Sequence, residues 1–219
     1  MLRSISKIVL PGLLLLIGGC AGMGPAGTGS RVTGNRSPVP ISAAQRSDFD
    51  RALGYMKKEQ YKKALPLLEG IVKENDSLPG AAINLAIVYM KLAGDDDKTN
   101  YEKAEKVLTR AIEVNPRNEV AQFQLGLLYR KTGRFELSRK AYEQAIKLNR
   151  NYAMAHYNLG ILCDIYMQQP KCAIEHYENY QTLVPEDSER VGKWLTDLRR
   201  RAGIPEPAPA VTAANKEVK

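Results

Sequence analysis

A pattern of large and small side chains recurs in this chain of 219 residues, at intervals of 34 residues or slightly more. Leu125 and Gly126 reappear one interval later as Leu159 and Gly160. A period of this length is typical of stacked helical hairpins, none of which can bury its apolar side alone. The pattern therefore predicts an elongated array of at least three stacked hairpins, rather than a fold built around one central sheet.

The repeated positions resemble the tetratricopeptide repeat, which has large residues at positions 4, 7, 11 and 24 and small ones at 8, 20 and 27. In the clearest copy, Leu125 and Tyr129 fill positions 7 and 11, and Gly126, Ser138 and Ala145 fill the three small positions. Four copies run in phase, over residues 45–78, 79–118, 119–152 and 153–187. The resemblance implies an all-α, right-handed superhelical solenoid of about four helix-turn-helix repeats.

Three copies depart from the family pattern. Arg51 occupies a position where the family usually has leucine, which makes the first copy the weakest. Six extra residues, 94–99, lengthen the turn of the second copy, and one extra residue is placed near Gln169 in the fourth. The acidic run at 95–97 lacks the alternation, glycine and terminal glutamate of a calcium loop, so we expect a solvated turn.

An amphipathic segment follows the repeats. Asp187, Ser188 and Glu189 form a helix start signal, and apolar residues then recur at helical spacing from Val191 to Leu198. Residues 188–201 are predicted to be a helix that caps the open end of the fourth repeat. The arginines at 199–201 suit the C-terminal end of a helix or, alternatively, contact anionic lipid. Residues 202–219 are predicted to be a disordered tail.

The N-terminus has the order of an export signal. Arg3 and Lys7 precede an apolar run of ten residues, 8–17, which is too short to span a bilayer. Residues 17–20, Ile-Gly-Gly-Cys, resemble a bacterial lipobox, with an ordinary signal peptide as the alternative. The resemblance implies removal of 1–19, acylation of Cys20 including palmitate, and anchoring at the periplasmic face of the outer membrane. Anchoring in a Gram-positive cell envelope is the alternative. Residues 20–44 are predicted to be a flexible tether.

The resemblance also implies a concave face lined by the first helix of each repeat. Positions 5 and 9 of all four copies are apolar or aromatic, and positions 6 and 12 add polar or larger groups. The predicted groove residues are Phe49, Leu53, Ile83, Asn84, Ile87, Met90, Phe123, Leu127, Arg130, Tyr157, Asn158 and Ile161. Such a groove fits an amphipathic helix or an extended apolar segment of a partner protein. Two alternatives are that the array closes on itself, or that the tether fills the groove.

Other functional classes find little support in the sequence. Of the residues that hold a terminal carboxylate in chaperone-binding members of the family, only Asn84 is present. His156 and His176 have no metal ligands at suitable spacing, and no phosphate-binding loop or nucleophile motif occurs. The net charge of +8 is modest, and the basic pairs lack interleaved aromatic residues. We therefore predict no enzyme, no metal or cofactor beyond the lipid on Cys20, and no nucleic-acid partner.

Two cysteines remain after Cys20. Cys163 and Cys172 lie on the two helices of the fourth repeat, across its turn. Export favours a disulfide between them, and two buried thiols are the alternative.

These features together predict a membrane-anchored adaptor for protein–protein interaction. Lipoproteins of similar build act as pilotins and in assembly of outer-membrane pili or secretion complexes, and others act as scaffolds for peptidoglycan hydrolases. A purely structural spacer is a third alternative. The repeat and lipobox patterns specify architecture, so they do not choose the partner or the oligomeric state.

Overall fold

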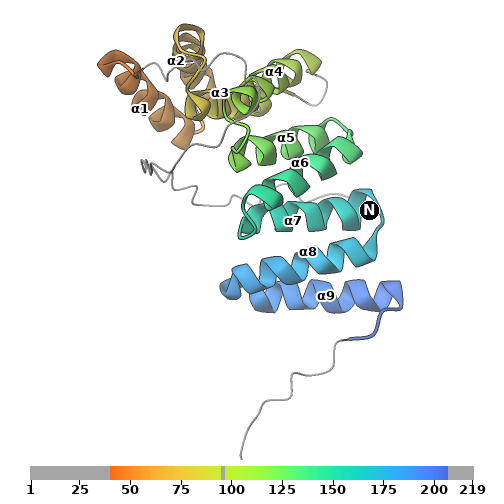
Figure 1. Cartoon of the computed structure of the whole chain (residues 1–219). Coiled ribbons are helices and arrows are strands. Elements are labelled where there is room, and N and C mark those ends of the chain that lie inside the picture. The colour runs from red at the N-terminus through yellow and green to blue at the C-terminus, as the bar shows by residue number, and fades with distance from the viewer. Residues whose placement is uncertain (1–39, 95–96, 207–219) are drawn as a thin grey trace, which may run out of the picture. The chain divides into compact units, whose positions relative to one another are not determined.

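The structure of the protein is a computed structural model that describes residues 40–94 and 97–206 (Figure 1). Every regular element in these ranges is a helix, as predicted. The helices form consecutive pairs: α1 (Ala43–Lys57) with α2 (Tyr61–Glu74), α3 (Pro79–Leu92) with α4 (Lys98–Val114), α5 (Glu119–Lys131) with α6 (Phe135–Leu148), and α7 (Ala153–Ile161) with α8 (Pro170–Leu183). We call the first helix of each pair helix A and the second helix B. The predicted signal peptide and Cys20 lie outside the described residues.

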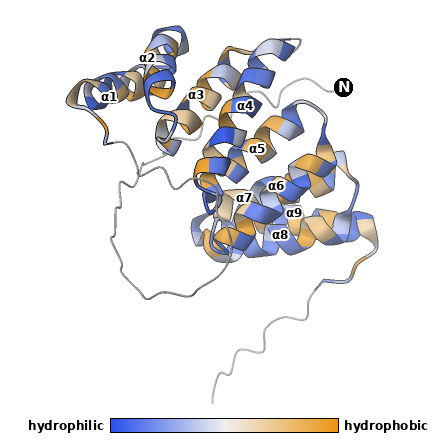
Figure 2. Cartoon of the chain, turned by 45° about the horizontal axis from the view of Figure 1, so that its top comes forward, coloured by the Kyte–Doolittle hydropathy of each residue, from blue (hydrophilic) through white to orange (hydrophobic). Residues whose placement is uncertain are grey.

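The pairs stack side by side into the expected right-handed solenoid. Each helix B contacts helix A of the next pair, and the buried apolar residues form two clusters, one from the first to the third repeat and one from the third repeat to the capping helix. Figure 2 shows apolar and polar residues alternating around the helices, as expected for helices that bury only one or two faces. None of the helices in the described ranges combines the length and the apolar character needed to cross a bilayer.

The first helix begins earlier than predicted and remains largely exposed. Ser42 and Gln45 form a reciprocal capping box, so α1 starts at Ala43 and takes the last two residues of the predicted tether. Ala52 is the buried residue of α1, because no repeat precedes this helix. Arg51, at the usual leucine position, is exposed and pairs with Asp48 at 2.8 Å. The weak first copy is therefore a polar end of the array.

Small residues allow the two helices of a repeat to approach closely. A Cβ atom added at Gly126 would lie 2.4 Å from two ring carbons of Tyr142, and one at Gly160 would lie 2.6 Å from the ring of Tyr177. Ser138, at a position where alanine is common, donates from Oγ to the carbonyl oxygen of Gly126 at 2.8 Å. Its hydroxyl is therefore satisfied inside the hairpin, and serine fits there without penalty.

The extra residue of the fourth repeat lies inside helix A rather than near Gln169. Helix α7 continues as a π-helical turn, η1 (Leu162–Tyr166), in which the Met167 amide donates to the Leu162 carbonyl at 3.0 Å. A π-turn absorbs one inserted residue without ending the helix. The turn that follows then returns to the repeat pattern, because Gln168 has φ of 54° where the third repeat has Gly133 at 72°.

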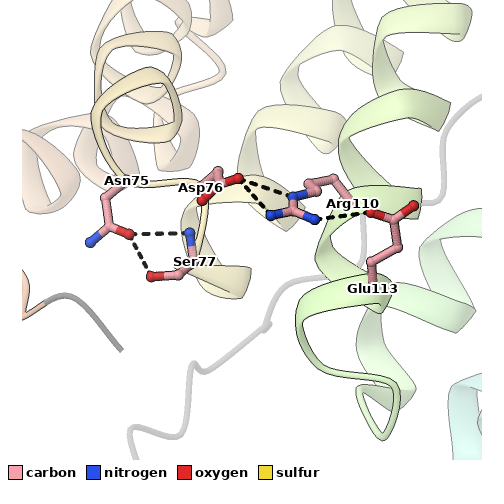
Figure 3. Close-up of polar contacts among 5 residues, drawn as sticks. All are labelled: Asn75, Asp76, Ser77, Arg110 and Glu113. Atoms are coloured by element: carbon pink, nitrogen blue, oxygen red, sulfur yellow. Dashed lines mark hydrogen bonds and ion pairs between the residues drawn. The ribbon is translucent and has the colours of Figure 1, made fainter. Parts of the chain in front are cut away.

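Asparagines organise the turns between repeats, a feature that the sequence analysis missed. The Oδ1 atom of Asn75 accepts hydrogen bonds from the amide and the hydroxyl of Ser77, and Asn115 and Asn149 each accept from the amide two residues later. In Figure 3, Asp76 of the first such turn faces Arg110 of α4. The two groups form an ion pair at 2.8 Å, which joins the first junction to the second repeat.

The C-terminal helix caps the fourth repeat, as predicted. After a 3-10 turn, η2 (Pro185–Asp187), α9 (Ser188–Ala202) packs on α8 and buries Val191, Leu195 and Leu198. Gly203, with φ of 64°, ends the helix. The chain stays packed beyond it, because Ile204 contacts the core and Glu206 pairs with Arg199 at 3.0 Å. The prediction of a tail beginning at residue 202 is therefore wrong for 202–206.

The arginines at the end of α9 pair with carboxylates of the protein. Arg199 is buried between Glu178 and Glu206, and Arg200 and Arg201 both contact Asp197. Burial removes Arg199 from the alternative of a contact with anionic lipid, whereas Arg200 and Arg201 stay exposed.

A candidate partner-binding surface

A row of apolar side chains remains partly exposed along the helices A. The four residues at repeat position 9, one from each repeat, are half-buried in the structure. We call them the position-9 row: Leu53, Ile87, Leu127 and Ile161. Each lies on a helix whose other face packs into the solenoid, so the row is held by rigid elements rather than by loops.

The other predicted groove residues divide between the core and the surface. Phe49, Arg130 and Tyr157 are half-buried, and five residues predicted to be accessible are instead buried. These are Ile83, Asn84, Met90, Phe123 and Asn158. The neighbouring helices of the stack therefore bury these five residues, so they do not form an open groove. The predicted groove narrows to a strip around the position-9 row.

The two asparagines of the predicted groove have local partners. The amide nitrogen of Asn84 donates to the carbonyl oxygen of Gly80 at 2.8 Å, and Asn158 makes the same bond to Met154. Each bond spans one turn of the residue's own helix and occupies the side-chain amide of a predicted groove residue. This outcome depends on rotamers and neighbours, which a repeat position does not specify.

Aromatic rings pack behind the strip in the third and fourth repeats. Phe123 lies between Tyr142 and Tyr152, at centroid distances of 5.8 and 5.1 Å. Tyr157 contacts Tyr180 at 5.0 Å and Trp194 of α9 at 6.1 Å, so the cap closes one edge of the strip. The position-5 side chains of the third and fourth repeats are therefore packed against other aromatic rings.

Arg130 lies one helical turn beyond Leu127 and has an unusual environment. Its Nη2 atom donates to Oδ1 of Asn158 at 3.1 Å, and its guanidinium lies 5.9 Å from the centroid of the Tyr166 ring. Its Nε atom is buried without a hydrogen-bond partner, as is the hydroxyl of Tyr142. Burial raises the pKa of Tyr142 to about 12, with the nearby guanidinium of Arg130 opposing the shift.

The fourth repeat contains a disulfide and an exposed apolar pair. Cys163 and Cys172 are bonded and join η1 to α8, which answers the question that the sequence left open. Between them, Ile165 and Tyr166 have 61% and 44% of their surface exposed. The repeat pattern does not predict the exposure of these two residues, because the π-turn that directs them outward has no repeat position of its own. The signal available in the sequence was the aromatic residue that comes directly before the lengthened turn of the fourth repeat.

The two histidines form a neutral pair. The Nδ1 atoms of His156 and His176 lie 3.2 Å apart, and Nε2 of His156 lies 3.1 Å from the Arg150 carbonyl oxygen. That carbonyl only accepts, so the network assigns a hydrogen to His156 Nε2 and leaves its Nδ1 to accept from His176. Burial lowers the pKa of both rings, and no group of three metal-ligating side chains occurs in the described part of the chain.

Comparisons with known proteins agree with this architecture. One family model, described as a TPR repeat, matches residues 126–163, and a second, described as a tetratricopeptide repeat, matches residues 95–136. The helix pairs recur at the same spacing on either side of these segments.

The described part of the chain folds as a solenoid of tetratricopeptide-type helix pairs, and the family models match residues 95–163 of it.

Solved structures of similar shape extend the likeness over most of the solenoid. A crystal structure of MamA protein superposes with a TM-score of 0.61 at 21% identity, covering 74% of this chain and 84% of that one. PilF of Pseudomonas aeruginosa gives a TM-score of 0.62 at 20% identity, covering 73% and 69%. At these identities the likeness establishes the fold alone.

Relatives identified by sequence share only part of their length with this solenoid. FlbA of Caulobacter vibrioides is 30% identical over 121 residues, which are 54% of this chain and 20% of FlbA. The photosystem I assembly protein Ycf3 of Prochlorococcus marinus is 32% identical over 94 residues, 43% of this chain and 46% of Ycf3. Tetratricopeptide proteins in general bind protein partners.

Proposed function

We propose that the chain is a lipid-anchored adaptor that binds a segment of a partner protein along the position-9 row during assembly of a cell-envelope complex. The observation that carries the proposal is the row itself. In all four repeats an apolar side chain is left half-exposed at the same place, and in the second, third and fourth repeats both residues that flank it in the sequence are buried. An apolar strip on rigid helices suits an amphipathic helix or an extended apolar segment.

Three further observations support the envelope part of this proposal. The lipobox-like sequence at 17–20 would attach the chain to a membrane, and two or more acyl chains give stable anchoring. The disulfide between Cys163 and Cys172 is of the kind that persists in oxidising compartments. Among the similar proteins, PilF has a name that suggests a pilus, and Ycf3 is named as an assembly protein. An outer-membrane pilus or secretion complex is the assembly that we propose.

The test is cross-linking of the full chain in its native cells, followed by identification of the captured proteins. We expect a channel or pilus subunit to be captured by the wild type and lost in the double variant Ile87→Lys/Leu127→Lys. Leu137→Lys is the matched control, because Leu137 is 43% exposed on a helix B, away from the row. If peptidoglycan hydrolases are captured by the wild type and lost in the double variant, the scaffold role replaces the assembly role.

The anchor is tested separately. Cys20→Ala should move the protein from the membrane fraction to the soluble fraction and abolish incorporation of labelled palmitate. A Cys20→Ala protein that stays on the membrane and keeps its function would refute the tether. Equal capture of every partner by the wild type and the Ile87→Lys/Leu127→Lys variant would refute binding along the row.

A further inference from the structure

A positively charged side chain without a carboxylate partner lies beside the position-9 row. Leu127 and Ile161 belong to the row, and Ile165 and Tyr166 extend the apolar surface beyond it. Arg130 follows Leu127 by one turn of α5 and lies against the ring of Tyr166. We call this set of five residues the Arg130 ledge. It combines exposed apolar area with one positive charge on a rigid helix.

Three other arginines of the third repeat and the capping helix are paired with carboxylates, whereas Arg130 and the adjacent Lys131 are not, in the part of the chain that the structure describes. Asp164, which occupies the equivalent position of the next repeat, pairs with Arg201 of α9 at 3.3 Å. Arg134 pairs with Glu105 and Arg139 pairs with Glu136, both at 2.8 Å. Across the described ranges Arg130 has no ion pair, and its hydrogen-bond partner is the neutral amide of Asn158. The protein therefore supplies an acid for each neighbouring arginine but leaves the charge of Arg130 unmatched.

The guanidinium of Arg130 is also oriented in advance. The bond to Asn158 fixes one end, and the aromatic ring of Tyr166 supports one face. A guanidinium held in this way loses little side-chain freedom when it binds a carboxylate, and it does so through its Nη atoms, because Nε is buried. The adjacent apolar area lowers the local dielectric and strengthens such a contact.

We propose that the Arg130 ledge recognises an acidic side chain that lies next to a large apolar residue in the bound partner segment. This inference rests on the proposed function, because it names the chemistry of the segment that occupies the row. The carboxylate pairs with Arg130, and the neighbouring apolar side chain packs against Ile165 and Tyr166. Charge complementarity selects this occupant over a purely apolar or a basic segment.

The experiment selects random twelve-residue peptides, displayed on phage, for binding to the full chain purified in detergent. The recovered peptides are synthesised and their affinities are measured by fluorescence anisotropy. We expect enrichment of Asp or Glu next to Leu, Ile, Phe or Trp. Arg130→Gln should weaken the binding of these peptides about tenfold or more, as should replacing the peptide acid by its amide.

Controls separate recognition of charge from loss of structure. The two losses should not add when Arg130→Gln is combined with the amide peptide, because both remove one contact. Arg130→Lys should recover part of the affinity, since it keeps the charge but loses the fork. Arg139→Gln is the matched control, because Arg139 also has a buried, unpartnered Nε but is already paired with Glu136. Its effect on affinity should be less than twofold.

Two results would overturn the inference, and they are distinguishable. Peptides that lose affinity in Ile87→Lys/Leu127→Lys but bind Arg130→Gln unchanged would refute the carboxylate contact and leave the proposed function standing. If no peptide is recovered, or if the recovered peptides bind the row variant as well as the wild type, both proposals fail.

Discussion

The contact between Gly126 and Tyr142 allows a sharp test of how the hairpins pack. Replacing Gly126 by alanine places a methyl group 2.4 Å from ring carbons of a fully buried tyrosine, where ordinary contact begins near 3.4 Å. The ring is held against Phe123 and the fourth repeat, so it has to shift by about 1 Å together with its neighbours. Overpacking of this kind costs roughly 1–3 kcal/mol. Alanine returns about 1 kcal/mol through its higher helix propensity.

The expected net effect for Gly126→Ala is a loss of unfolding free energy of up to about 2 kcal/mol. Gly70→Ala is the matched control, because Gly70 lies in α2 and an added Cβ would meet nothing within 4 Å. That change should gain about 0.5–1 kcal/mol. Guanidinium titration followed by far-ultraviolet circular dichroism compares the two midpoints directly. The variants should move in opposite directions from the wild type.

A double-mutant cycle isolates the ring as the cause. In a Tyr142→Leu background the obstructing ring is gone, so Gly126→Ala should become neutral or stabilising. A Gly126→Ala protein as stable as Gly70→Ala, or an unchanged penalty in the Tyr142→Leu background, would refute the close-approach explanation of this glycine.

Three further predictions concern the fourth repeat. Burial lowers the pKa of His156 and His176 below 6.5, so the unfolded chain binds more protons than the folded chain at acidic pH. The unfolding free energy should therefore fall as the pH drops below about 6.5. His176→Gln should make this fall shallower when denaturation midpoints are measured from about pH 5 to 8. Gln168→Gly should raise the thermal midpoint or leave it unchanged. It removes roughly 1–2 kcal/mol of strain from the left-handed backbone at φ of 54°, but glycine also adds conformational entropy to the unfolded chain. Reduction of the Cys163–Cys172 bond should lower stability by about 2–3 kcal/mol, given the short loop of sequence separation 9 that it closes, and Cys163→Ser should respond to denaturant as the reduced protein does.

The repeat pattern contained most of the architecture. The spacing of Leu125, Gly126, Tyr142 and Ala145 reports which residues must be small or large where two helices cross, and that geometry is the same in every repeat. Pattern reading therefore located all four hairpins and the capping helix. Helix ends were less well determined. The residues of the capping box are visible in the sequence, but the predicted tether includes Ser42, which caps α1 in the structure.

The exposure of individual side chains was decided only by the tertiary structure. A repeat position states which face of a helix a residue lies on, but burial depends on what the neighbouring repeats place over that face. Ile83 and Phe123 therefore entered the core, while Ile87 and Leu127, one turn further along the same helices, stayed half-exposed.

The Arg130 ledge shows the same division more clearly. The sequence by itself determined that Arg130 lies on helix A of the third repeat, one turn from Leu127, because helical spacing is a local property. It did not determine that Asp164 would pair with Arg201, or that a π-turn would bring Tyr166 beside the guanidinium. Those contacts join residues from three different elements, and their distances exist only once the helices are packed.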